Sequence, residues 1–160
     1  MEKQQWHVRP AILRDLDTLV GFQRQMALET EGWELDPATL ERGMLQTFLD
    51  ANKGKYWVAE IPNATKKDKP VGMLMTQYEW SDWRCQNVIW IQSVFITEEA
   101  RRKGVYRAMY EYLWQQVQED DSLSGIRLYV ERQNENAIKT YKALGMETEH
   151  YALCEQMKDF

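Results

Sequence analysis

The stretch that most constrains the fold is an apolar segment followed at once by basic residues and an amphipathic segment. Residues 88–96 read V-I-W-I-Q-S-V-F-I, an almost unbroken run of β-branched and aromatic side chains, typical of a strand buried on both faces. Residues 101–113 read R-R-K-G-V-Y-R-A-M-Y-E-Y-L, in which apolar residues recur at three- and four-residue spacing. The order predicts a buried strand, a basic loop and a helix.

The predicted loop has the features of an anion site. Gly104 lets the backbone approach a ligand closely, and the first amides of the following helix have no intrahelical acceptor. The positive end of the helix dipole lies at the same place. Four cations add charge there: Arg101, Arg102, Lys103 and Arg107. The segment predicts a phosphate or pyrophosphate site, with a basic helix start that contacts only solvent as the alternative.

A second motif lies downstream, where residues 134–146 read N-E-N-A-I-K-T-Y-K-A-L-G-M after the apolar segment I-R-L-Y-V. Together the two motifs resemble the GNAT superfamily of acetyl-CoA-dependent N-acetyltransferases. In the family's loop pattern, V-x-x-x-x-[RQ]-x-x-G-x-[GA], Ile96, Arg101 and Gly104 hold the first three defined positions and Tyr106 departs from the last. The family's pattern N-x-x-A-x-x-x-Y-x-x-x-G-[FM] is met in full, and the N-terminal W-H-V-R-P-A-I-L-R-D-L-D-T-L resembles its first strand and helix.

The order of elements predicts one α/β domain over residues 1–160, with a GNAT-like central mixed, mostly antiparallel sheet and helices on both faces. We expect strands near residues 6–9, 56–61, 71–79, 88–96, 126–130 and 151–157. Helices are expected at residues 16–28 and 136–144, and two more are expected to begin at Pro37 and at residue 105. Asp36 would be the N-cap of the helix that begins at Pro37, and a left-handed Gly145 would end the last helix. A polar loop, P-N-A-T-K-K-D-K-P, joins the second and third strands.

The resemblance implies that acetyl-CoA is the co-substrate. By position in the motifs, the residues that would bind it are Val94, Phe95, Ile96, Arg101, Arg102, Lys103, Gly104, Val105, Tyr106, Arg107, Asn134 and Tyr141. A backbone N–H near Val94 or Phe95, where the family carries a β-bulge, would stabilise the oxyanion. Tyr141 would protonate the leaving thiolate. The alternatives are a core role for Tyr141 and a helix-start role for Asn134.

The general base is not set by the resemblance. Many relatives offer a glutamate on the buried strand, whereas this chain has Gln92, which cannot act as a base. Glu79, at the end of the preceding strand, is the nearest plausible carboxylate, and a role at the surface is its alternative. We favour a route in which Gln92 and Ser93 hold a water that carries the proton to solvent; capture of the small fraction of unprotonated amine is the other alternative.

Two loops are candidates for recognising the acceptor. The first, E-T-E-G-W-E-L-D-P, carries carboxylates around an aromatic ring and would attract a cationic amine; its candidate residues are Glu29, Glu31, Trp33 and Glu34. The second, Y-E-W-S-D-W-R-C-Q, supplies Trp80 and Trp83. Related polyamine acetyltransferases carry a similar tryptophan-containing turn. A solvated helix end and a cap of the core are the respective alternatives.

Composition excludes several other classes. The net charge of −5 argues against a nucleic-acid or anionic-membrane partner, and Cys85 and Cys154 lack metal-ligand spacing to either histidine, so we expect no metal. Without a membrane-length apolar run or a signal-peptide core, a cytoplasmic location is expected. A homodimer stays open. The expected function is acetyl transfer to a primary amine of a small molecule or peptide; the alternatives are a non-catalytic acyl-CoA sensor and a module that binds an acidic protein.

Overall fold

The computed structural model describes residues 6–61, 69–148 and 151–158, which fall into two compact units, residues 1–128 and 129–160. The predicted loop between the second and third strands lies largely outside the described residues. The described part of the first unit contains β1 (His7–Pro10), α1 (Leu16–Glu31), α2 (Pro37–Leu49), β2 (Lys55–Glu60), β3 (Gly72–Ser81), β4 (Gln86–Ile96), α3 (Val105–Glu119) and β5 (Leu123–Leu128). Short 3₁₀ turns lie at η1 (Leu13–Asp15), η2 (Ala51–Lys53) and η3 (Glu98–Ala100).

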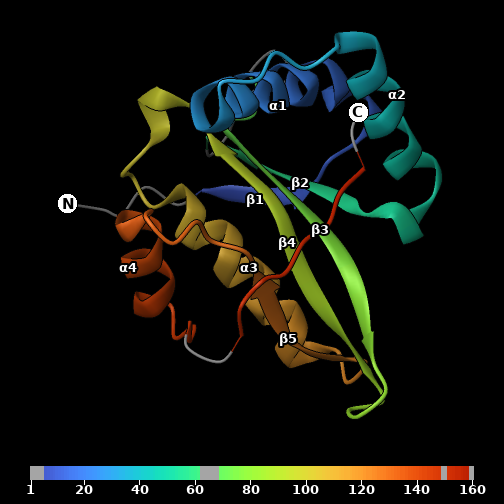
Figure 1. The fold of residues 1–160 in the computed structure, drawn as a ribbon, viewed down its shortest axis with the longest axis vertical. Coiled ribbons are helices and arrows are strands. Elements are labelled where there is room, and N and C mark those ends of the chain that lie inside the picture. The colour runs from blue at the N-terminus through green and yellow to red at the C-terminus, as the bar shows by residue number, and fades with distance from the viewer. Residues whose placement is uncertain (1–5, 62–68, 149–150, 159–160) are drawn as a thin grey trace. The chain divides into compact units, whose positions relative to one another are not determined.

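The strands of the first unit form one mixed sheet in the order β1-β2-β3-β4-β5 (Figure 1). Neighbouring strands from β1 to β4 are antiparallel, and β5 runs parallel to β4. The parallel pair requires a crossover, which α3 supplies. The predicted mixed, mostly antiparallel sheet is therefore confirmed.

Helices cover both faces of this sheet (Figure 1). On one face, Leu19 of α1 and Met44 of α2 pack in a core cluster with Val58 of β2. On the other face, the ring of Trp57, the neighbour of Val58 in β2, lies 5.6 Å from that of Tyr112 in α3. Because successive side chains of a strand point to opposite faces, β2 is buried from both sides, as the apolar sequence of its centre requires.

The end of α1 and the start of α2 determine where the acidic residues between residues 29 and 36 lie. Asp36 caps α2 as predicted, its Oδ2 accepting a hydrogen bond from the Thr39 N–H at 2.8 Å. Helix α1 runs three residues further than predicted and ends only at Gly32, which adopts the left-handed conformation with φ 69°. Glu29 and Glu31 therefore lie on the last turn of a helix rather than in a loop.

The second unit contains α4 (Glu135–Ala143). Gly145 follows it with φ 87°, and its N–H donates to the Lys142 carbonyl at 3.0 Å, so the predicted left-handed end is confirmed. The strand predicted around residues 151–157 is wrong: residues 151–158 adopt no regular structure, and their side chains are exposed. An alternating sequence forms a strand only where one face is buried, and that burial is missing here.

Candidate functional site

Strand β4 changes its pairing halfway along its length. Toward β3, Ile91 pairs with Thr76 and Ser93 with Met75, so Gln92 is an extra residue that forms a β-bulge. Toward β5, the last pair is Ile91 with Leu128. Among the residues that the structure describes, the half of β4 from residue 92 to 96 therefore pairs with β3 alone, and its other edge is open.

The hydrogen bonds at the end of β4 show which backbone groups face the open edge. The Thr97 N–H donates to the Val71 carbonyl at 2.9 Å, on the β3 side, whereas the Ile96 carbonyl accepts from Arg101 Nε at 2.9 Å. Backbone groups of successive strand residues point to opposite edges, so Val94 shares the open edge with Ile96. Of the two predicted oxyanion donors, the geometry favours the Val94 N–H. The Phe95 N–H points toward β3, and the Phe95 side chain is buried.

The segment from Thr97 to Gly104, which we call the donor loop, joins the open half of β4 to α3. It turns through η3 and two left-handed residues, Arg102 (φ 61°) and Gly104 (φ 83°). Ala108 is the first residue of the helix whose N–H has a helical acceptor, the Gly104 carbonyl at 3.0 Å. A Cβ on Gly104 would meet no protein atom within 4 Å. Space is therefore open at the residue that precedes the helix, as the close approach of an anion requires.

Three contacts fix the donor loop and the two elements that it joins to the rest of the first unit. Trp6 Nε1 donates to the Lys103 carbonyl at 2.9 Å. Gly72 lets the helix start approach the sheet, since a Cβ there would lie 3.1 Å from Val105 Cγ1 and 3.0 Å from Ile96 Cδ1. Sequence reasoning missed Gly72, although an isolated glycine at the start of a strand is a known signal of close approach. The third contact is made by Arg101.

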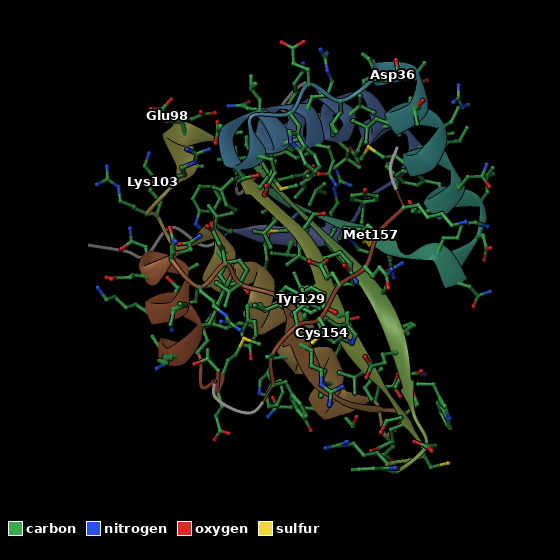
Figure 2. All side chains as sticks on the ribbon, in the orientation of Figure 1. Asp36, Glu98, Lys103, Tyr129, Cys154 and Met157 are labelled. Atoms are coloured by element: carbon green, nitrogen blue, oxygen red, sulfur yellow. The ribbon has the colours of Figure 1, made fainter. Side chains whose placement is uncertain are left out.

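The basic residues of the site differ in what they contact. Arg101 Nη2 lies 2.6 Å from Glu29 Oε2, and its guanidinium lies over the Phe95 ring at 5.7 Å. Arg102 and Lys103 are exposed on the donor loop, which Figure 2 marks at Glu98 and Lys103. Arg107 lies 3.6 Å from Glu111 in an exposed pair one turn apart. The loop therefore places exposed cations next to the N-terminus of α3, which fits a pyrophosphate group.

A buried polar cluster beside the bulge was not predicted. Gln23 of α1 donates from Nε2 to Tyr56 Oη at 3.3 Å and to Ser93 Oγ at 3.2 Å. Burial raises the pKa of the Tyr56 phenol, so the hydroxyl stays protonated. Because Gln23 and Tyr56 are distant in sequence from Ser93, only the fold brings them together. The cluster places polar groups under the open half of β4, on the face covered by α1 and α2.

Glu79 lies in β3 opposite Val88, in the part of the sheet where β4 is paired on both sides. Its two carboxylate oxygens accept hydrogen bonds from Trp90 Nε1 and from Arg127 Nη1, each at 2.5 Å. These contacts tie β3, β4 and β5 together. They favour a structural role for Glu79 over the role of a base, since both oxygens already have donors.

The structure does not bring the two predicted acceptor loops together. Trp33 is 60% exposed beside the end of α1, and Glu34 is also exposed between α1 and α2. Trp80 and Trp83 lie at the opposite end of the sheet, at the tip of the β3–β4 hairpin, where Trp83 is 91% exposed. Trp80 follows the bulge position in β3 by four or five residues, roughly 15 Å along a strand.

The second unit contains the other two predicted site residues. Asn134 caps α4, with Oδ1 accepting from the Ala137 N–H at 3.0 Å, which is the helix-start role. Tyr141 lies on the last turn of α4, and burial raises the pKa of its phenol above the ordinary value of 10.0. A raised pKa keeps the proton on the phenol at neutral pH, as a proton donor requires.

The described residues contain no group of three or more histidine, cysteine or acidic side chains that could hold a metal ion. None of the helices described is both long and apolar enough to span a membrane.

Known structures share this fold over nearly the whole chain. A structure described as that of "a possible acetyltransferase from Clostridium difficile 630" is 40% identical, with a TM-score of 0.86, and the match covers 98% of this chain and 99% of that one. A "probable acetyltransferase" is 20% identical, with a TM-score of 0.81, covering 96% and 99% of the two chains. An aminoglycoside acetyltransferase from an uncultured soil metagenomic sample, in complex with sisomicin, is 14% identical, with a TM-score of 0.73 and coverage of 96% and 97%.

A comparison with curated protein sequences gave no match. The family model described as "Acetyltransferase (GNAT) family" matches residues 17–146, a range that includes α1, the bulged strand, the donor loop and α4. The match thus extends through both units. Together with the 40% identity over almost the full chain, it shows that this protein belongs to the GNAT family of acetyltransferases.

Proposed function

We propose that this protein transfers the acetyl group of acetyl-CoA to a primary amine of a small molecule or peptide, by direct attack in a ternary complex. Membership of the family implies acyl transfer from acetyl-CoA. The observation that carries the proposal is the open half of β4, which leads straight into the donor loop. An open strand edge that ends at an anion site suits a long, polar co-substrate that carries a pyrophosphate group.

The residues present fit acetyl-CoA at the charged end. The amides at the start of α3 would hold the pyrophosphate, with Arg102, Lys103 and Arg107 adding charge around it. Tyr106 replaces the small residue of the family pattern, but an anion bound by backbone amides tolerates a side chain that points away. When bound, the co-substrate supplies the thioester that the amine attacks.

The chemistry needs three groups from the protein. As nitrogen attacks the thioester carbonyl, the carbon–sulfur bond breaks and negative charge develops on oxygen. The Val94 N–H, on the open edge, is our candidate for stabilising that oxygen, a role worth roughly a hundred- to a thousandfold in rate. Tyr141 would give its proton to the departing thiolate and later regain one from solvent.

The amine must lose a proton, because an alkylamine with a pKa near 10.4 is almost wholly protonated at neutral pH. Glu79 stays a candidate base from the sequence, yet both its oxygens already accept hydrogen bonds. Gln92 is exposed at the bulge, and Ser93 belongs to the polar cluster beside it. We therefore retain the route in which these two residues hold a water that takes the proton to solvent.

For the acceptor, we propose a cationic amine. Glu31, Trp33 and Glu34 are exposed near the end of α1, where they would attract and pack such a molecule. One structural relative is an aminoglycoside acetyltransferase and another is a ribosomal-protein-alanine N-acetyltransferase, so both small molecules and peptides belong in the test. The proposal keeps no role for nucleic acid or membranes.

The second candidate function is a non-catalytic acyl-CoA sensor, favoured by one observation: the exposed bulge residue is Gln92 rather than a carboxylate. Thiol release from acetyl-CoA, followed with a panel of polyamines, aminoglycosides, amino acids and peptide N-termini, separates the two. Amine-dependent release supports the enzyme. Binding of CoA in calorimetry without release on any amine supports the sensor, and absence of binding contradicts both and favours the protein-binding module.

A further inference from the structure

The ion pair between Glu29 and Arg101 joins the end of α1 to the donor loop across 72 positions of sequence. Arg101 Nη2 donates to Glu29 Oε2 at 2.6 Å, while Arg101 Nε donates to the Ile96 carbonyl at 2.9 Å. The guanidinium thus contacts the last residue of β4 and α1 together. Its position over the Phe95 ring further limits its freedom.

Glu29 is itself held in place. Its second oxygen, Oε1, accepts a hydrogen bond from Gln25 Nε2 at 2.8 Å, one turn earlier on α1. The hydrogen bonds from Gln25 and from Arg101 lower the pKa of Glu29, so the carboxylate is charged at neutral pH. Both oxygens of Glu29 and two nitrogens of Arg101 are therefore engaged.

Two consequences follow for the site. A carboxylate with both oxygens engaged is poorly placed to receive a cationic amine, the role for which Glu29 is a candidate from the sequence. A guanidinium that contacts a carboxylate and a carbonyl is likewise a poor ligand for a phosphate, although the motif placed Arg101 in that role. Arg102 and Lys103, beside it on the donor loop, are exposed and remain for the phosphates.

We propose that Glu29 is a positioning residue for co-substrate binding, acting through Arg101, which anchors the donor loop instead of binding phosphate. The inference rests on the proposed function, because it assumes that acetyl-CoA binds at this loop. It assigns Glu29 to the donor side of the site and leaves Glu31 and Glu34 as the acidic residues that face the acceptor. The pair also links α1 directly to the loop that holds the co-substrate.

Whether Glu29→Gln raises or lowers the Kd of acetyl-CoA decides between the two roles of Arg101. If Arg101 anchors the loop, Glu29→Gln weakens the anchor and raises the Kd of acetyl-CoA roughly three- to fivefold, the range expected for an exposed ion pair. If Arg101 binds phosphate, Glu29→Gln frees it and removes a competing negative charge, so the Kd falls. Calorimetric titration of the full-length variants with acetyl-CoA, at low and high salt, measures this directly.

A double-mutant cycle tests whether the two residues act as one unit. Arg101→Gln should raise the Kd about as much as Glu29→Gln, and the double variant no more than either alone. Glu41→Gln on α2 makes the same change of net charge at another exposed position and should leave the Kd unaltered. The KM of the amine should stay unchanged in Glu29→Gln, which a general loss of fold would not spare.

The outcomes separate this inference from the proposed function. A wild-type protein that fails to bind acetyl-CoA would contradict the proposed function itself. Wild-type binding with a Kd that is unchanged or lower in Glu29→Gln would overturn the positioning role alone. The same holds if Arg101→Gln raises the Kd far more than Glu29→Gln, or if Glu29→Gln raises the KM of cationic amines.

Discussion

The two halves of β4 have similar sequences and different surroundings. Residues 87–91 pair with β3 on one side and β5 on the other, and the Glu79 carboxylate ties the three strands together through Trp90 and Arg127. Residues 92–96 pair with β3 alone and lead into the donor loop. One extra residue, Gln92, stands at the boundary. The paired half thus holds the sheet together, while the half that pairs with β3 alone is the one at which we propose that the co-substrate binds.

The largest expected effect concerns Tyr141, the proposed acid. Tyr141→Phe should lower turnover by roughly a hundred- to ten-thousandfold, because the leaving thiolate loses its proton donor. The Kd of acetyl-CoA should stay close to that of the wild type, since the ring is retained. Steady-state kinetics with calorimetry check both. Unchanged turnover with a lower melting temperature would make Tyr141 a core residue.

The next effect tests whether the donor loop extends the open half. Gly104→Val places a branched side chain in the open space before the helix start, at a φ of 83°. Steric block and backbone strain of about 1–3 kcal/mol should raise the Kd of acetyl-CoA tenfold or more. Gly32→Val is the matched control, because Gly32 is also left-handed, at φ 69°, with open space around it.

For this pair of variants, similar losses of melting temperature are expected, since the backbone conformations are alike. Acetyl-CoA affinity should fall only in Gly104→Val. Equal affinities for acetyl-CoA in the two folded variants would show that the donor loop does not bind the pyrophosphate. The proposed difference in function between the two halves of β4 would then lose its support.

Much of this organisation was predictable from local sequence signals. The strand ending at Ile96, the start of α2 behind Asp36 and the left-handed Gly145 each depend on residues within a few positions, and each is confirmed. The resemblance also implied a bulge, placed near Val94 or Phe95; it lies at Gln92. Periodicity could not place it, because a bulge is set by how two strands pair rather than by one strand's sequence.

Long-range contacts account for what the sequence did not predict. Glu29 is paired with Arg101, 72 positions away, and Gln23 with Ser93, 70 positions away, so no spacing pattern reveals these contacts. The acidic residues and the tryptophans looked equally suited to an acceptor loop, and only the sheet register separates Trp80 from the bulge. The prediction of a strand near the C-terminus was wrong for a related reason, because the local sequence does not show whether a neighbouring strand is present to pair with it.

A smaller effect is expected in the paired half of β4. Glu79→Gln removes the ion pair with Arg127, which is partly exposed, so the free energy of unfolding should fall by about 1 kcal/mol or less. Turnover should change by less than about threefold, because Glu79 is not needed for the water route. Denaturant unfolding and the pH–rate profile measure the two. A large loss of turnover with an altered acidic limb of the profile would identify Glu79 as the base.

The smallest effect concerns the acceptor. Glu31→Gln combined with Glu34→Gln should raise the KM of cationic amines about two- to threefold, because exposed carboxylates act through a screened field. High salt should reduce the difference, and the KM of acetyl-CoA should not move. Kinetics on the amine panel at two ionic strengths provide the measurement. Identical KM values on every accepted amine would leave the hairpin with Trp80 and Trp83 as the remaining candidate.

The most direct test of the account is amide hydrogen exchange, residue by residue, with and without CoA. Binding along the open half and the donor loop should slow exchange at Val94 and at the amides of residues 102–107. Residues 87–91, which are already paired on both sides, should exchange at unchanged rates. If CoA binds while exchange at 94 and 102–107 stays the same, the open half of β4 and the donor loop are not its site.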